Sequence, residues 1–241
     1  MPLLRLIAPL TLLLAAPAFA DEPEPTVLLD QSFTLHASAE DADEPMGLYA
    51  LHAEQAGNQI TITESVELAT RNSTIDMSSV VIYKQDKKAG WLFQGATAAT
   101  GVDGADVMKV SVEPKDTKWL VKTTFISDDQ GKPLGDPHTK TRTLDIPKGP
   151  VLFSSARAVI GPRLQPRPGQ QPIVWVEFPD DIDEDINIKQ GFSLVREEPD
   201  QAGTYHLWIK SDHQTLGPLP LNQAGQLKPH QLWGKMLMRE E

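Results

Sequence analysis

The chain has 241 residues with a formal net charge of -11, and it contains no cysteine. The absence of cysteine excludes disulfide bonds, a thiol nucleophile, a thiolate metal site and a lipid-bearing N-terminal cysteine. The acidic balance argues against nucleic acid or an anionic membrane surface as a partner.

The first twenty residues, 1–20, have the pattern of a secretory signal peptide. Arg5 precedes a mostly apolar run over residues 6–16, and the small residues of "AFA" at 18–20 suit cleavage after Ala20. The run is shorter than the roughly 20 residues needed to cross a bilayer, and no later segment could cross one. The pattern predicts a periplasmic or secreted protein with no membrane-spanning segment after cleavage. An uncleaved N-terminal anchor is the alternative.

Residues 21–45 are predicted to form an acidic leader that contains several prolines. The stretches "DEPEPT" and "AEDADEP" carry most of its charge. Between them, "TVLLDQSFTLHAS" is a possible first strand. We expect one folded domain, residues 46–241, to follow this leader.

Most of residues 46–241 alternate between apolar and polar side chains with a period of two, which is typical of half-buried strands. In "QITITESVELA", Ile60, Ile62, Val66 and Leu68 share one side, and "DVMKVSVE" and "GTYHLWIKS" repeat the pattern. Short polar loops with Gly separate the runs: "QDKKAG", "VDGAD", "SDDQGK", "EPDQAG" and "NQAGQ". The sequence therefore predicts a mainly β fold, a long antiparallel meander that forms a curved sheet or half-barrel.

One segment departs from this alternation. In "PKGPVLFSSARAVIGPRL" the apolar residues recur at helical spacing. Pro150 suits a first helical turn, and Gly161-Pro162 is a stop signal. We expect one short helix near 150–160, packed on the sheet.

Two tryptophans are the candidate ligand contacts. Trp175 lies in "QPIVWVEFP", a run that is apolar on both faces and must be covered on both, by the helix, another sheet or a ligand. Trp208 shares the wetter face of its strand with His206 and Lys210, where an indole can serve as a contact surface. The alternative for Trp208 is a ring that lies flat over neighbouring aliphatic side chains.

The acidic stretch "FPDDIDEDINIK", residues 178–189, is a candidate cation site. Its spacing does not fit the helix-loop-helix calcium loop, because a count from Asp181 or Asp183 finds neither Gly at the sixth position nor Glu at the twelfth. Alternation of Asp181, Asp183 and Asp185 with isoleucines predicts a solvated strand face. A weak surface calcium site is the alternative.

No metal site, cofactor or catalytic centre is predicted. The six histidines do not form a metal-binding spacing, and the chain lacks a nucleophile elbow and phosphate-binding glycine loops. We therefore expect that the protein is not an enzyme. Carboxylates from separate strands that meet in one cleft would leave no such motif, so an enzyme of that kind is kept as an alternative.

The order of these elements, ending in the hairpin "GTYHLWIKSDHQTLGPLPLNQAGQL", resembles the bacterial envelope half-barrel (β-clam) proteins, which are similar to lipoprotein-localisation carriers and uncharacterised periplasmic relatives. The resemblance covers most of residues 46–241 and rests on element order without a diagnostic motif. It implies a curved sheet that closes on a helix around a dry apolar cavity, which holds an acyl chain or another apolar molecule. The function it favours is an exported soluble binding protein. A non-enzymatic envelope module whose partner is another envelope protein is the alternative.

Overall fold

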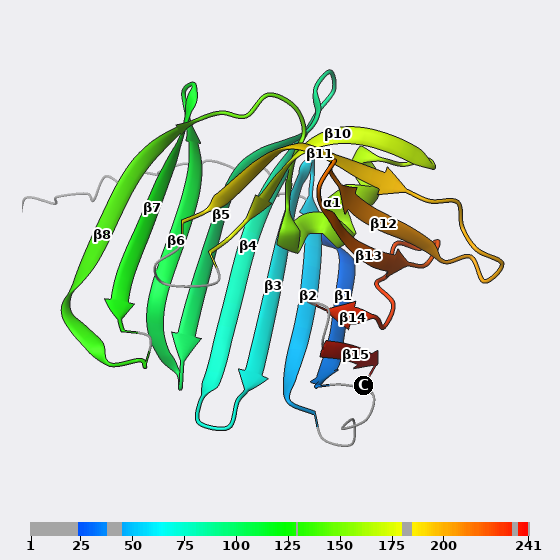
Figure 1. The fold of residues 1–241 in the computed structure, drawn as a ribbon. Coiled ribbons are helices and arrows are strands. Elements are labelled where there is room, and N and C mark those ends of the chain that lie inside the picture. The colour runs from blue at the N-terminus through cyan, green and yellow to red at the C-terminus, as the bar shows by residue number, and fades with distance from the viewer. Residues whose placement is uncertain (1–23, 38–44, 129, 180–184, 233–235, 241) are drawn as a thin grey trace, which may run out of the picture.

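A ten-stranded antiparallel sheet forms most of the computed structural model (Figure 1). The structure describes residues 24–37, 45–128, 130–179, 185–232 and 236–240. Eight strands follow one another across the sheet in chain order, and two C-terminal strands extend it beyond the first. Their bounds are β1 (Thr26–His36), β2 (Gly47–Ala56), β3 (Gln59–Ala69), β4 (Thr74–Asp86), β5 (Gly90–Val102), β6 (Ala105–Lys115), β7 (Lys118–Ser127), β8 (Pro133–Asp145), β14 (Gln231–Leu232) and β15 (Met236–Glu240).

A second sheet of five strands lies across one end of the first (Figure 1). Its order is β13-β12-β11-β10-β9, and only the β9–β10 pair is parallel. A 3-10 turn, η1 (Ser154–Ala156), and the helix α1 (Arg157–Leu164) connect β9 to β10 and contact the inner face of the large sheet. The strand bounds are β9 (Val151–Phe153), β10 (Gly169–Glu177), β11 (Asn187–Arg196), β12 (Tyr205–Lys210) and β13 (Thr215–Leu221).

The predicted fold class is confirmed: the chain is mainly β, with a long antiparallel meander in a curved, unclosed sheet and one short helix packed on it. The predicted turns join strands as expected. In the β5–β6 turn Asp103 and Gly104 have φ values of 51° and 77°, the two positive angles that an Asp-Gly hairpin turn requires.

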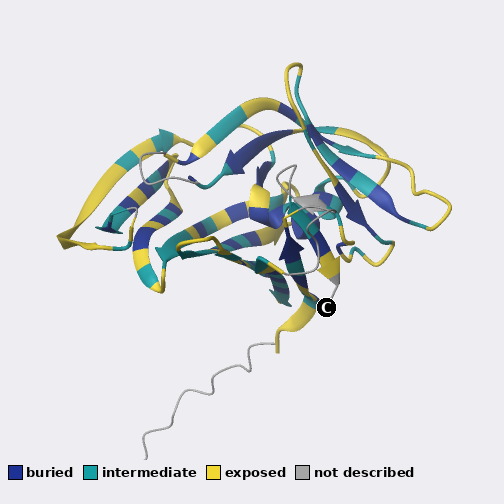
Figure 2. Cartoon of the chain, turned by 60° about the horizontal axis from the view of Figure 1, so that its bottom comes forward, coloured by how far each residue is buried: buried dark blue, intermediate teal, exposed yellow. Residues whose placement is uncertain are grey.

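The core lies between the two sheets, where the buried inner residues of most strands alternate with more exposed ones (Figure 2). Its centre is an aromatic cluster of five side chains. Phe93 stacks on Phe153 with ring centroids 4.8 Å apart and contacts Trp119 at 5.0 Å. Phe178 lies 5.2 Å from Phe153, and Tyr83 completes the cluster beside Phe93. Under this part of the small sheet the half-barrel is therefore solid.

The helix begins later than predicted and does not stop at the predicted place. Val151–Phe153, expected in its first turn, form β9, because three consecutive bulky residues that are all buried suit a strand covered on both faces. The helix then runs from Arg157 through Gly161 and Pro162 to Leu164. A Cβ on Gly161 would lie 3.0 Å from Leu207 Cδ1, so glycine lets the helix approach β12 closely.

The possible first strand in the predicted leader is a strand, but it is an integral part of the large sheet. β1 pairs with β2 on one side and with β15 on the other, and Phe33 lies opposite Glu240. The predicted signal peptide, residues 1–20, lies outside the described residues, as do 21–23 and 38–44 of the leader. In the part of the chain that the structure describes, no helix is both long and apolar enough to span a bilayer.

One buried hydroxyl joins the two sheets. Tyr83, on β4, is fully buried, and its Oη donates to the Val151 carbonyl at 3.2 Å and accepts from the Phe153 N–H at 3.2 Å. β9 is the edge strand of the small sheet, so these groups would otherwise have no strand partner. Tyr83 thus fixes the segment that leads into α1 on the inner face of the large sheet.

We predict that Tyr83→Phe lowers the free energy of unfolding by about 1–3 kcal/mol, because the Val151 carbonyl and the Phe153 N–H are left buried without a partner. Urea titration followed by tryptophan fluorescence measures the change. Tyr205→Phe is the matched control: Tyr205 is also buried, but its hydroxyl has no hydrogen-bond partner among the described residues. Equal stability of the two variants would contradict the role given to Tyr83.

Candidate functional site

A cavity of about 580 Å³ lies between the two sheets, next to the aromatic cluster. Its floor is the inner face of β2 to β5, and its roof is formed by η1, the start of α1, the end of β10 and the strand β13. The inner face carries small side chains here: Ser79 lies opposite Ala98, whereas the larger Met77 and Val81 flank Ser79 on the same face of β4. The cavity opens to solvent.

The cavity is not the dry apolar one that the resemblance implied. Apolar side chains, including Met77, Trp175 and Leu216, line part of it. Polar side chains from both the floor and the roof line the rest, and some of them are ionisable. The expectation of a dry, wholly apolar cavity is therefore wrong. A purely apolar ligand would leave the ionisable side chains of the lining without partners.

On the floor, Glu64 occupies an inward position of β3. Ile60, Ile62 and Val66 on the same side of the strand are buried, so a carboxylate replaces an apolar residue in the pattern. The Tyr49 hydroxyl on β2 donates to Glu64 Oε1 at 2.9 Å. Burial raises the pKa of Glu64 above its usual range, although the Tyr49 hydrogen bond and the Arg157 charge oppose the rise. Burial, followed by the neighbouring Glu64 charge, raises the pKa of Tyr49.

The roof places Arg157 above this pair, at the first residue of α1. Burial lowers the pKa of the Arg157 guanidinium to about 10, so it remains a cation at neutral pH. The charges of Tyr49 and Glu64 raise the same pKa, and all three residues line the cavity. Within the described chain no hydrogen bond or ion pair within 4 Å engages the guanidinium.

Three further polar groups of the cavity lining lack a hydrogen-bond partner among the described residues: Ser79 Oγ, Ser155 Oγ and His230 Nε2. Ser79 is 6% exposed and Ser155 is 4% exposed. His230 Nδ1 donates to the Lys228 carbonyl at 2.9 Å, which leaves Nε2 as the free acceptor of the neutral ring. Burial lowers the pKa of His230 and so favours this neutral form.

A second carboxylate at the cavity, Glu177, is already engaged. Its Oε1 accepts from Trp175 Nε1 at 2.7 Å, and its Oε2 pairs with Lys189 Nζ at 2.6 Å. The charges of Glu177 and Lys189 therefore offset one another. The indole of Trp175 is held in place by the same carboxylate.

Of the two tryptophans predicted as ligand contacts, the structure places one at the cavity. Trp175 is 3% exposed and lines the roof. Trp208 is not a lining residue: it lies on the outer face of β12, with Lys210 Nζ 5.0 Å from the centre of its ring. Ligand contact by either residue stays a prediction.

The acidic stretch lies largely outside the described residues, which exclude 180–184 and with them Asp181 and Asp183. Asp185 is described, and it pairs with Arg142 of β8 at 3.1 Å. Among the described residues, no three His, Asp or Glu side chains gather as a group that could hold a metal ion.

Reasoning from sequence missed the polar residues of the cavity, Glu64, Arg157 and Ser79 among them. A signal was present for two of them. Glu64 interrupts the apolar side of "QITITESVELA", and Arg157 interrupts the apolar stretch between Ala156 and Ala158. An ionisable residue at an inward position needs a partner or a function.

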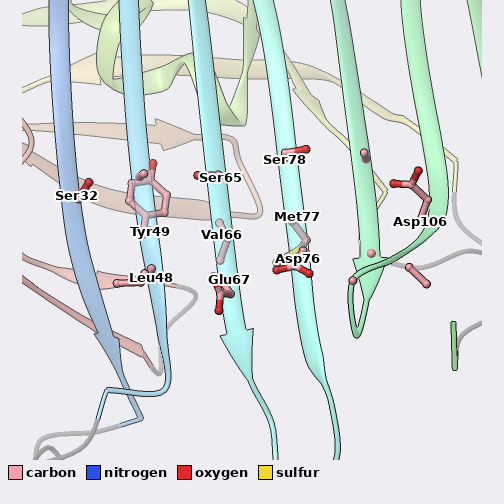
Figure 3. Close-up of a pocket in the computed structure, with 15 residues that line it drawn as sticks. Ser32, Leu48, Tyr49, Ser65, Val66, Glu67, Asp76, Met77, Ser78 and Asp106 are labelled. Atoms are coloured by element: carbon pink, nitrogen blue, oxygen red, sulfur yellow. The ribbon is translucent and has the colours of Figure 1, made fainter.

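A second hollow, of about 410 Å³, lies on the outer face of the large sheet (Figure 3). Small side chains, such as Ser32, Ser65 and Ser78, form it, and Glu67 and Asp76 lie along one side. Of its lining residues, none has a buried side-chain group without a partner among the described residues. The cavity between the sheets is therefore the candidate site.

Comparison with known proteins places the chain in no family. No family model matches it, and no curated protein matches it. The crystal structure of a beta-barrel-like protein of the domain of unknown function DUF1849, from Brucella abortus, is similar with a TM-score of 0.48 and 12% identity. The match covers 88% of this chain and 94% of that chain. A similarity of this degree transfers no residue role, and the resemblance to lipoprotein-localisation carriers stays a prediction.

We predict that Glu64→Gln becomes increasingly stable relative to the unmodified protein as the pH rises above the usual pKa of a glutamate. The raised pKa of Glu64 means that the folded state holds the proton longer than the unfolded state, so the carboxyl stabilises the fold at low pH and loses that contribution as pH rises. Glutamine cannot ionise, and it still accepts from Tyr49.

Urea titrations at several pH values measure this difference in unfolding free energy. Glu67→Gln is the control, since Glu67 is exposed on the opposite face of the same strand. A Glu64→Gln difference that stays constant with pH, as removal of a solvated carboxylate would give, would contradict the buried environment assigned to Glu64.

Proposed function

We propose that the protein is an exported, soluble binding protein that shelters a lipid-like or other largely apolar small molecule in the cavity between its two sheets. The cavity itself is the observation that carries the proposal. Its volume of about 580 Å³ falls within the roughly 300–1,000 Å³ of small-molecule sites. Export rests on the signal-peptide pattern of residues 1–20.

The lining supports a ligand with an apolar part. Met77 on the floor faces a roof that includes Trp175, Phe178 and Leu216. Each CH₂ group moved from water to such surroundings contributes about 0.8 kcal/mol, so an alkyl chain of moderate length supplies useful affinity without charged recognition.

The exposed edge of the large sheet does not favour the alternative of an envelope interaction module. The edge strand β8 is exposed along nearly all of its length (Figure 2). It carries Pro133 and Pro137 together with Lys140 and Arg142, residues that discourage pairing with another strand. An enzyme with paired carboxylates would use Glu64 and Glu177, but Glu177 is already held by Lys189 and Trp175.

We predict that the protein binds N-phenyl-1-naphthylamine, a neutral apolar dye whose fluorescence rises in apolar surroundings, and that Ala98→Phe weakens this binding by about tenfold or more. Ala98 is on the floor, so a phenyl ring there fills space that the dye needs.

Fluorescence titration measures both affinities. Thr97→Phe is the control, because Thr97 is exposed on the opposite face of the same strand and does not line the cavity. A protein that does not bind the dye, or two variants that weaken binding equally, would remove this cavity as the binding site.

A further inference from the structure

We propose that the cavity selects an anionic amphiphile, a molecule with an alkyl chain and a carboxylate or phosphate head, and that Arg157 with the hydroxyls of Ser79 and Ser155 receives the head. This inference rests on the proposed function, since it names the class of ligand that the same cavity takes. It goes further because an apolar molecule alone has no need of these three groups.

The first observation is the guanidinium of Arg157. It lines a sheltered cavity at the start of α1, and no hydrogen bond or ion pair within 4 Å engages it in the described chain. A sheltered cation without a partner has lost part of its hydration and has gained no contact in return. A guanidinium presents a fork of N–H donors that matches the oxygens of a carboxylate or a phosphate.

The second observation is independent of Arg157. Ser79, on the floor, and Ser155, in the roof, are more than nine-tenths buried, and their hydroxyls have no partner among the described residues. Both residues line the same cavity. Buried hydroxyls are nearly always hydrogen-bonded in folded proteins, so two free ones on facing walls indicate a ligand with polar atoms.

The charges around the cavity favour a negative head over a neutral or positive one. Five ionisable residues line it: Tyr49, Glu64, Arg157, Glu177 and His230. Lys189 pairs with Glu177, and burial favours the uncharged forms of Tyr49, Glu64 and His230. Arg157 is a cation at neutral pH, and burial opposes a negative charge on Glu64 beside it.

Glu64 and His230 determine how ligand binding changes with pH. A bound anion beside Glu64 and His230 favours their protonated forms, so binding takes up protons and strengthens as the pH falls. The gain ends where the ligand's own head becomes protonated, because a neutral head no longer pairs with Arg157.

The apolar part of the lining is continuous with these polar groups. Met77 on β4 is two residues from Ser79, and Ala158 follows Arg157 on the helix. A molecule with its head at Arg157 can therefore place its chain against Met77, Trp175 and Leu216 without leaving the cavity. An inorganic anion would satisfy the head site and leave these residues uncovered.

Three ligands with the same ten-carbon chain test the proposal: decanoate, decyl phosphate and decanol. Each is titrated as a competitor of N-phenyl-1-naphthylamine on the full-length mature protein at a pH near 7.5, below its critical micelle concentration or, for decanol, below its solubility limit. We expect one or both anions to bind at least about tenfold tighter than decanol, the increment of a charge-assisted contact. Preference for decyl phosphate indicates a phosphate head, and preference for decanoate indicates a carboxylate head.

Arg157→Gln should abolish the preference for the anion and leave decanol binding within about twofold, whereas Arg157→Lys should retain part of it. Arg163→Gln is the matched control, because Arg163 lies on the same helix but does not line the cavity. Urea titration of each variant shows that it is folded.

The outcomes separate the two proposals. If decanol binds as well as both anions, or if Arg157→Gln keeps the preference, recognition of an anionic head is wrong and the cavity remains a binding site. If neither the dye nor any decyl compound binds the unmodified protein, the proposed function fails and the inference fails with it.

Discussion

The segment that joins β9 to α1 has to be held against the inner face of the large sheet, and the rest of the structure depends on this constraint. Two interactions impose it. The Tyr83 hydroxyl bonds the free edge of β9, and the ring of Phe153 enters the aromatic cluster between Phe93 and Phe178. Ser155 and Arg157 come two and four residues after Phe153 in the chain. The packing of Phe153 therefore sets their positions above the floor of the cavity.

The sequence indicates the fold well because the signals of a meander are local. Alternation along β3 and the Asp103-Gly104 turn depend on neighbouring residues, and both are present in the structure as predicted. The start of the helix differs from the prediction, because a short apolar run such as Val151–Phe153 has the same pattern in a helical turn and in a buried strand. The division into two sheets has no local signal, because the strand patterns of "QPIVWVEFP" and "GTYHLWIKS" do not indicate which sheet each strand joins, and the β9–β10 pair joins strands across the helix.

The site could not be predicted in the same way, because it combines residues from both sheets. Nothing near Glu64 in the sequence indicates that Arg157 lies above it, and the space beside them arises from the absence of bulk at Ser79 and Ala98. The apolar residues on both faces around Trp175 predict burial, and burial alone does not distinguish a residue of the packed core from one that lines a cavity. The ionisable residues at inward positions were the better indicator.

The pairing of β1 with β15 also affects how the molecule is assembled during synthesis. The eight meander strands can pair with their neighbours as the chain emerges, but Phe33 meets Glu240 only after nearly all of the polypeptide has been made. Until then, the backbone of β1 offers an open template to any extended segment. A chaperone that shields nascent β1 would therefore protect this protein at its most vulnerable stage, and a truncation that removes β15 would leave that template open permanently.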